Sequence, residues 1–285
     1  MHQVADSVWV ETEHLGSNNS VIVTSDGVVL VDAPHKPSDA QRWAARVTEF
    51  GPVRYLVNTD HHPDHTIGNA WLPGTVVSYA GTRTTLKVAA PTDDYLRELF
   101  ARIDPDAVEL VDGYSVRLPQ LVYSERLDLY LGDEVLELSF HPGHTANNTV
   151  AYLPSQRVVF TGDNVCSAGL PSFQDSTLSE WFDALDFIES LDADVVVPGH
   201  GDVGGPELIG AFRDLGRQLI HRVAGAINSG QSLERMASEI RFEDNIHVDT
   251  PCYVGYPDWL VETFQRNTIA RLYRDLTAEP SLAKR

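Results

Sequence analysis

The chain lacks several features that would place it in other classes of protein. Its 285 residues include two cysteines and 21 lysines and arginines against 41 aspartates and glutamates. Two cysteines cannot form a disulfide framework, so we expect a cytoplasmic protein that does not depend on oxidation. The net charge of −20 argues against nucleic acid and anionic lipid as partners, because both need a basic surface.

Long apolar segments are also missing. No uninterrupted apolar run approaches the ~18 residues of a transmembrane helix. The first ten residues do not show the basic and then apolar pattern of an export signal. We therefore expect a protein that is not attached to a membrane and acts on a small molecule. The 42% of apolar residues is enough for a sizeable buried core.

The sequence alternates short β-branched runs with helical patterns. Two such runs flank a Ser-Asp-Gly turn within residues 21–31 and predict a hairpin. Ser38 and Gln41 have the spacing of a capping box, which predicts the start of a helix. Residues 1–205 are therefore expected to form one mixed α/β unit. Apolar residues then recur every three or four positions, so residues 206–285 are predicted to be a helical extension.

A polar cluster follows the predicted strand 53–58. Residues 60–65 read Asp-His-His-Pro-Asp-His, with three imidazoles and two carboxylates within six positions. Imidazole and carboxylate are the usual protein ligands of zinc, iron and manganese. A solvated polar turn is the alternative interpretation of this segment. Asp32 ends an earlier strand, where it can hydrogen bond with the same loop.

Three further polar residues each follow a predicted strand. His144 lies in a Pro-Gly-His-Thr segment, Asp163 in Thr-Gly-Asp, and His200 in Pro-Gly-His-Gly. Each alone is typical of an ordinary turn. Their order behind the first cluster is more informative, because loops at the ends of strands can meet at one edge of a sheet and often carry catalytic groups.

In this order the four segments resemble the metallo-β-lactamase superfamily. The resemblance covers roughly residues 5–205 and includes the opening hairpin. It implies an α/β fold, a four-layer α/β/β/α sandwich, with two metal ions at one edge of the sheets. The superfamily includes lactonases, thioesterases, β-lactamases, phosphodiesterases, nucleases and flavin-diiron proteins.

The resemblance also implies a ligand set. It places His62 and His144 at the first metal, together with the residue at position 60. The remaining metal ligands that it implies are Asp64, His65 and His200 at the second metal, and Asp163 as a bridge between the two. Two divalent cations are expected, with zinc first and iron or manganese as the other options.

Position 60 departs from the family pattern His-x-His-x-Asp-His, because it holds aspartate. Asp60 is shorter than histidine, so it reaches the metal only if the loop moves closer or a water intervenes. Three outcomes stay open: Asp60 binds the first metal, the first site is weakened, or His61 replaces Asp60. A third carboxylate would shift the preference from zinc towards iron or manganese.

The mechanism implied by this site is metal-assisted hydrolysis of a small ester, lactone, thioester or amide. Water held between two cations loses a proton near neutral pH and becomes a hydroxide nucleophile. Asp64 is the expected catalytic residue, because it can accept the proton and carry it to the leaving group. Thr145 and Thr161 are candidates to hold ligand side chains in place.

Two rival functions remain: a diiron-type redox protein on the same fold, and a non-catalytic metal-binding module. The aromatic segment 252–259 has two interpretations, as part of the active-site mouth or of a helical dimer interface. The helical pattern of residues 206–285 favours the second, which predicts a homodimer through the C-terminal helices.

Overall fold

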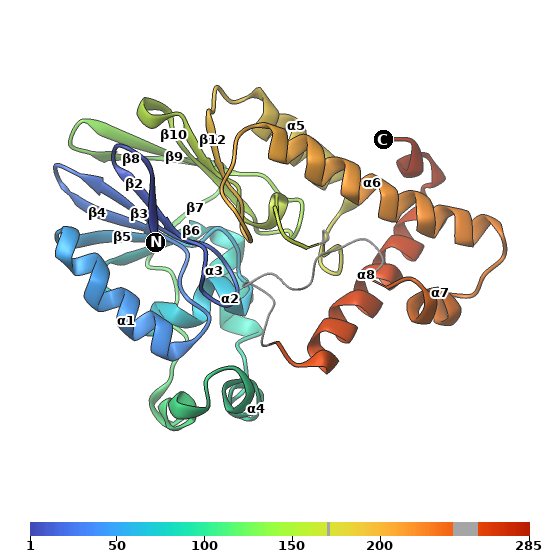
Figure 1. Cartoon of the computed structure of the whole chain (residues 1–285), viewed down its shortest axis with the longest axis horizontal. Helices are drawn as coiled ribbons and strands as arrows, with labels where there is room; N and C mark the ends of the chain where they lie inside the picture. The colour runs from blue at the N-terminus through green and yellow to red at the C-terminus, as the bar shows by residue number, and fades with distance from the viewer. Residues whose placement is uncertain (170–171, 242–255) are drawn as a thin grey trace.

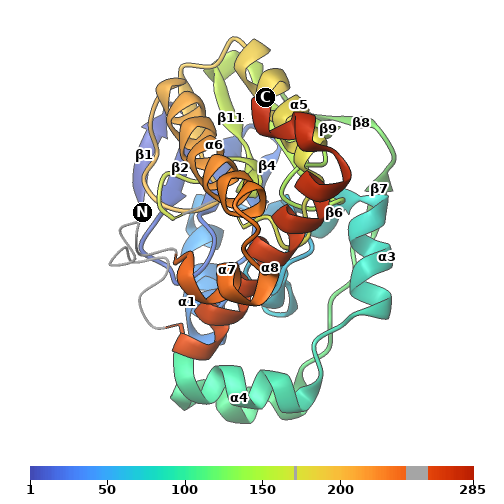
Figure 2. The same cartoon turned by 90° about the vertical axis from the view of Figure 1, so that its right-hand side faces the viewer.

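Two β-sheets face each other, and helices cover the outer side of each sheet (Figure 1). This computed structural model describes residues 1–169, 172–241 and 256–285. The layers follow the order α/β/β/α, and the C-terminal helices lie beside the second sheet (Figure 2). The predicted fold class is therefore confirmed.

The first sheet has seven strands in sequential order, antiparallel from β1 to β4 and parallel from β4 to β7. The predicted hairpin is its β3–β4 pair. The strands are β1 (His2–Ala5), β2 (Val8–Glu11), β3 (Asn19–Thr24), β4 (Gly27–Val31), β5 (Val53–Val57), β6 (Thr75–Tyr79) and β7 (Leu121–Tyr123).

The second sheet has five strands in the spatial order β12-β11-β10-β9-β8. Its strands are antiparallel except for the parallel pair β11–β12. They are β8 (Arg126–Leu131), β9 (Glu134–Phe140), β10 (Thr149–Leu153), β11 (Val158–Phe160) and β12 (Val195–Val197).

Apolar side chains fill the spaces between the layers. One cluster, with Val31 and Leu138, lies between the two sheets. A second packs Trp43 against the outer side of the first sheet, and a third packs Trp181 against the outer side of the second. The helices are α1 (Pro37–Val47), α2 (Pro63–Thr66), α3 (Ala80–Val88), α4 (Asp93–Ile103), α5 (Leu178–Ser190), α6 (Glu207–Asn228), α7 (Leu233–Glu239) and α8 (Asp258–Ala278). None of the described helices is long and apolar enough to cross a membrane.

Helix α1 corrects one detail of the sequence prediction. The helix is present, but Lys36 is its N-cap and no side chain caps it, so the capping-box interpretation of Ser38 is wrong. Pro37 occupies the first helical position, where its fixed φ is favourable, and this places Ser38 inside the first turn. The Ser38 amide instead donates to Asp104 Oδ2 at 2.8 Å.

The C-terminal helices share a hydrophobic cluster with α5 and the second sheet. Residues of α6 and α8 lie in this cluster, as do Val150 of β10 and Val159 of β11. The other end of α8 reaches a different cluster, where Leu260 packs with α4 residues such as Leu99. We propose that residues 206–285 extend the unit formed by residues 1–205.

The loops after β5, β9, β11 and β12 end at the same edge of the sandwich, and hydrogen bonds connect them. Thr149 N donates to Thr59 O at 2.8 Å, and Gly199 N donates to Gly162 O at 3.0 Å. Asn18 Nδ2 donates to the carbonyls of Pro198 and Gly201 at 2.9 and 2.8 Å. These bonds fix the mutual position of segments that are far apart in the sequence.

A cavity variant tests whether α8 stabilises the whole chain. Leu272 is fully buried in the cluster shared with the second sheet. Leu272→Ala is expected to lower the free energy of unfolding by about 2–5 kcal/mol, because it removes buried methyl groups and leaves a cavity. Urea denaturation followed by circular dichroism measures this, with Val88→Ala, at a position that is 78% exposed, as the control. An unchanged midpoint for Leu272→Ala would show that α8 does not contribute to the core.

Candidate metal centre

The loop after β5 carries four of the seven predicted ligands. Pro63 occupies the first turn of the short helix α2, and His62 is its N-cap. The turn places Asp64 and His65 at the start of this helix, while Asp60 precedes it. The other three side chains come from the loops after β9, β11 and β12, namely His144, Asp163 and His200.

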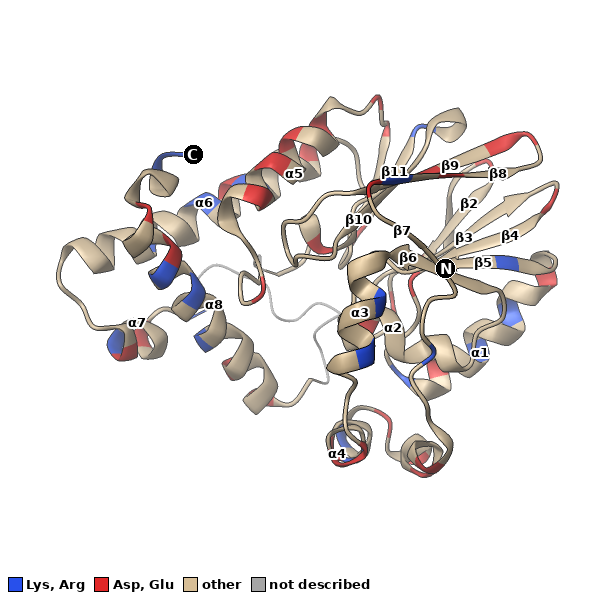
Figure 3. Ribbon diagram, turned by 180° about the vertical axis from the view of Figure 1, so that it is seen from behind, with Lys and Arg blue, Asp and Glu red and all other residues tan. Residues whose placement is uncertain are grey.

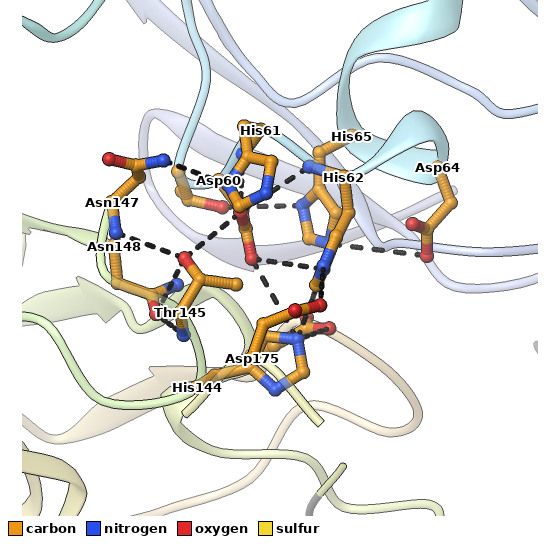
Figure 4. Close-up of polar contacts among 12 residues, drawn as sticks. Asp60, His61, His62, Asp64, His65, His144, Thr145, Asn147, Asn148 and Asp175 are labelled. Carbon is orange, nitrogen blue, oxygen red and sulfur yellow. Dashed lines mark hydrogen bonds and ion pairs between the residues drawn. The ribbon is translucent and has the colours of Figure 1, made fainter. Parts of the chain in front are cut away.

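Asp60, His62 and His144 form the first group that could hold a metal ion. His62 Nδ1 lies 3.3 Å from Asp60 Oδ2 and 3.2 Å from His144 Nε2, and His144 Nε2 lies 3.8 Å from Asp60 Oδ2. Figure 4 shows these side chains converging from two loops. Two imidazole nitrogens and one carboxylate oxygen are suitable ligands for a divalent transition metal.

Asp64, His65 and His200 form the second group. Asp64 Oδ2 lies 3.3 Å from His200 Nε2 and 4.0 Å from His65 Nε2. Asp163 lies between the groups: its Oδ1 is 3.2 Å from His65 Nε2, and its Oδ2 is 3.5 Å from His144 Nε2. A carboxylate in this position can bridge two cations.

Asp60 is held so that one carboxylate oxygen faces the first group. Its Oδ1 accepts hydrogen bonds from the backbone amides of His61 and His62 and, at 3.2 Å, from the hydroxyl of Thr145. Its Oδ2 makes no hydrogen bond with the described residues and faces His62 and His144. The shorter side chain is thus oriented as a ligand by its own loop together with Thr145 from the loop after β9.

His61 takes a different position from the one that a replacement ligand needs. Its Nδ1 lies 2.9 Å from Asp60 Oδ1 and 3.1 Å from Asn147 Nδ2. It therefore contacts Oδ1 of Asp60, whereas Oδ2 is the oxygen that faces His62 and His144. His61 belongs to neither group. Among the three outcomes left open by the sequence, this geometry favours Asp60 as the ligand.

Two carboxylates outside the groups orient ligand imidazoles. Asp32 Oδ2 accepts from His65 Nδ1 at 2.9 Å, and Asp32 Oδ1 accepts from the Thr59 amide at 2.8 Å. Asp175 Oδ2 lies 3.2 Å from His62 Nε2. In each pair the carboxylate binds one ring nitrogen and directs the other towards the metal group. The expected hydrogen bonding of Asp32 with the loop is confirmed.

Three buried atoms at the centre test whether this set fits metal ions. Asp60 Oδ2, His65 Nε2 and Asp163 Oδ1 make no hydrogen bond of good geometry with any described residue. Their short contacts are ion pairs, as between His65 Nε2 and Asp163 Oδ1, and a buried polar atom without a hydrogen bond costs free energy and is rare in folded proteins. Coordination of two cations would satisfy all three, so the donor set fits a dinuclear site.

The pKa values of these groups reflect the short distances between opposite charges. Burial raises the pKa of Asp60, but His62 and His61 lower it further, so its net pKa lies well below the ordinary value. Burial lowers the pKa of His65, but Asp32 and Asp163 more than reverse this, and its net pKa is well above the ordinary value. Asp60 in the same way raises the pKa of His62.

The structure brings all seven predicted ligands together at one edge of the sandwich. Of the two threonines expected to hold ligands, Thr145 contacts Asp60, whereas the Thr161 hydroxyl, among the described residues, donates only to backbone carbonyls, such as that of Gly162. Thr161 is therefore an ordinary strand-end residue, which contradicts that expectation. Cys166 is buried in the cluster beneath α5, in agreement with a packing role.

Sequence reasoning missed the residues that surround the groups. A cavity of about 190 Å³ beside them is lined by His35, Tyr95, Asp175, Tyr256 and others. His35 Nδ1 lies 2.9 Å from the Tyr256 hydroxyl, and burial lowers the pKa of His35 to about 4. Tyr256 thus supports the active-site interpretation of the aromatic segment, of which residues 252–255 lie outside the described residues. No local pattern marks these residues, because they come from separate loops.

The comparisons with known proteins agree with this geometry. The sequence model of the metallo-beta-lactamase superfamily matches residues 13–200. A metallo-beta-lactamase type 2 from Bacteroides fragilis is 24% identical over 76% of this chain and 85% of its own length. A hydroxyacylglutathione hydrolase from Mesorhizobium japonicum is 30% identical over 51% of this chain and 46% of its own length. The solved structure of a metallo-beta-lactamase from Pontibacter korlensis is 23% identical, and the match covers 75% of this chain and 96% of that chain with a TM-score of 0.58.

The two facing sheets and the paired His/Asp groups at their edge define a metal-binding protein of the α/β/β/α class. The chain belongs to the metallo-beta-lactamase superfamily. Relatives in this superfamily include enzymes named as hydrolases, which supports an enzymatic role for the chain.

A pair of variants distinguishes Asp60 from His61 as the ligand. Asp60→Asn keeps the shape of the side chain but removes its charge, so bound metal is expected to fall from about two ions per chain to about one. His61→Asn is expected to leave the metal content unchanged. Elemental analysis of the purified proteins measures both. The assignment is wrong if His61→Asn loses metal and Asp60→Asn keeps it.

Metal binding is also expected to release protons at pH 7. His62 and His65 have raised pKa values in the metal-free protein, so both retain protons that a metal must displace. The apparent affinity should therefore rise with pH, with release of about two protons near neutrality. Calorimetric titration in phosphate and in Tris reveals the protons as a difference in heat. Identical heats in the two buffers would contradict this expectation.

Proposed function

We propose that the protein is a metal-dependent hydrolase that acts on a small ester, lactone, thioester or amide. The observation that supports this proposal most strongly is that four separate loops bring together two His/Asp groups, with Asp163 between them. Asp60, His62 and His144 would hold one divalent cation, and Asp64, His65 and His200 the other. Zinc is the first candidate, and the third carboxylate makes iron and manganese the alternatives.

When bound, the two cations would supply an activated water and polarise the substrate oxygen. The chain itself contributes the placement of the proton acceptor. Asp64 Oδ2 lies at the wall of the cavity, and 18% of the Asp64 side chain is exposed. Burial raises its pKa, but His65 and His200 lower it further, so Asp64 is a carboxylate at neutral pH.

Asp64 can therefore accept a hydrogen bond from the attacking water and then carry its proton. In an ester, the water oxygen bonds to the carbonyl carbon, the bond to the leaving oxygen breaks, and Asp64 delivers the proton to that oxygen. The products are a carboxylic acid and an alcohol. Asp32 and Asp175 contribute by keeping the rings of His65 and His62 in place.

The variant Asp64→Asn tests this role. The amide keeps the size of the side chain but cannot take up a proton, so kcat/KM is expected to fall at least about 100-fold. The assay is a hydrolysis panel of lactones, esters, thioesters and β-lactams with the metal-loaded protein. Asp106→Asn, an exposed position away from the cavity, serves as the control. Full activity of Asp64→Asn on the best substrate would exclude Asp64 as the proton carrier.

The third carboxylate also favours a second candidate, a diiron-type redox protein. Oxygen donors suit iron, and Asp60 adds one where the family pattern has an imidazole. This candidate requires tightly bound iron and reaction with dioxygen or with a flavin partner. Elemental analysis together with an oxygen electrode distinguishes it from the hydrolase, which binds two metal ions and consumes no oxygen.

We also propose a cytoplasmic setting, supported by the presence of only two cysteines. A small-molecule substrate fits the acidic composition, which disfavours nucleic acid and membrane lipid. The homodimer through the C-terminal helices stays a prediction, which light scattering of the purified protein decides.

A further inference from the structure

Two recesses meet at the metal groups, with His62, Pro63 and Asp175 in both linings. The first, the α8 recess, is the cavity of about 190 Å³, and its outer wall consists of Tyr95, Tyr256, Leu260 and Phe264. The second, the α3 recess, measures about 210 Å³ and is lined further by Thr85, Leu86, Ala89, Pro91, Tyr114 and Val116. Both walls are largely apolar.

The non-imidazole charged groups in these linings are all acidic. Asp64 and Asp163 belong to the metal groups, and Asp175 stands in both recesses with 51% of its side chain exposed. Among the described residues, no lysine or arginine lines either recess. The sequence of residues 170–171 and 242–255 contains neither lysine nor arginine.

Three basic residues occur near the recesses, but their side chains make other contacts or lie at exposed positions. Arg83 and Lys87 lie at exposed positions of α3, which Figure 3 shows from behind, and Arg83 donates to the Pro119 carbonyl. Arg117 donates to backbone carbonyls that include that of Leu72. None of these three side chains is part of either lining.

The metal groups themselves add little positive charge. Asp60, Asp64 and Asp163 would offset three of the four charges of two divalent cations, and an activated water would offset the last. Asp175 then adds a negative charge at the mouth. An anionic group placed in the apolar part of either recess would lose hydration without a lysine or arginine of the lining to pair with, which is unfavourable.

We infer that the substrate is an ester, lactone, thioester or amide whose acyl chain is apolar and uncharged, and that Asp175 excludes acyl chains that end in a carboxylate. This inference rests on the proposed hydrolase function. This preference for an uncharged substrate would distinguish the protein from enzymes that hydrolyse β-lactam antibiotics or glutathione thioesters, because those substrates carry carboxylates. The apolar chain would lie in one recess and the leaving group in the other, with the scissile bond at the metal groups.

Two matched esters test the inference. The substrates are p-nitrophenyl hexanoate and its analogue with a carboxylate at the end of the acyl chain, both assayed with the metal-loaded protein. We expect kcat/KM for the neutral ester to exceed that for the anionic ester by at least about tenfold. In Asp175→Asn, which keeps an oxygen facing His62, this ratio should fall several-fold, while Asp106→Asn keeps it unchanged.

A binding measurement makes the test independent of turnover. Hexanamide and its analogue with a terminal carboxylate are offered to the metal-loaded protein, and saturation-transfer NMR detects contact. We expect signals from hexanamide and much weaker signals from the anionic amide, with the difference reduced in Asp175→Asn. Equal signals from both amides, or equal rates on both esters, would overturn the inference.

The two failures are distinguishable. If neither ester is hydrolysed although two metal ions are bound, and the wider panel is also inert, the hydrolase function is wrong. The amides still decide the charge preference of the recesses in that case. If the anionic ester is hydrolysed as fast as the neutral one, the hydrolase function stands and the inferred substrate class is wrong.

Discussion

The structure depends on one electrostatic constraint: three carboxylates and four imidazoles, five of these seven residues buried, share a small volume at one edge of the sandwich. Charged and polar groups are stable in such a place only when each has a partner. Part of the pairing is internal, as between Asp32 and His65. The atoms that lack a hydrogen bond, such as Asp60 Oδ2, face the two groups of ligand atoms. Cations bound at these groups would satisfy them.

Asp60 illustrates how the chain adapts its backbone to an unusual ligand. In the family pattern this position holds an imidazole, which reaches its metal by length. Here the carboxylate is positioned by hydrogen bonds to its Oδ1, from the two following amides of its own loop and from the Thr145 hydroxyl of a separate loop. The same bonds define which oxygen is available, so a shorter side chain acquires one defined direction. The additional negative charge also makes this centre less attractive to anions.

Much of the fold and of the centre could be predicted from the sequence because the signals are local. The hairpin turn and the histidine-rich run each lie within a few consecutive residues, and four short segments in a fixed order predicted the candidate ligands that the structure brings together. The aromatic composition of segment 252–259 suggested the neighbourhood of Tyr256 but not its contact with His35. Asp175 could not be found at all, because nothing near it in the sequence indicates that it meets His62. The error at Ser38 had a local cause as well: Pro37 takes the first helical position, so the N-cap is Lys36, two residues before Ser38, and a spacing rule does not detect this.

The two hydrogen bonds from Asn18 to the Pro198 and Gly201 carbonyls have a consequence for how the protein matures. They join segments separated by about 180 residues, so they form only after nearly the entire α/β unit has been synthesised and both sheets have been assembled. Contacts of such long range are slow to establish during folding, because a large loop must close first. The histidine-rich loop is therefore synthesised early, whereas the two His/Asp groups are completed last. We expect metal binding to follow when folding is nearly finished.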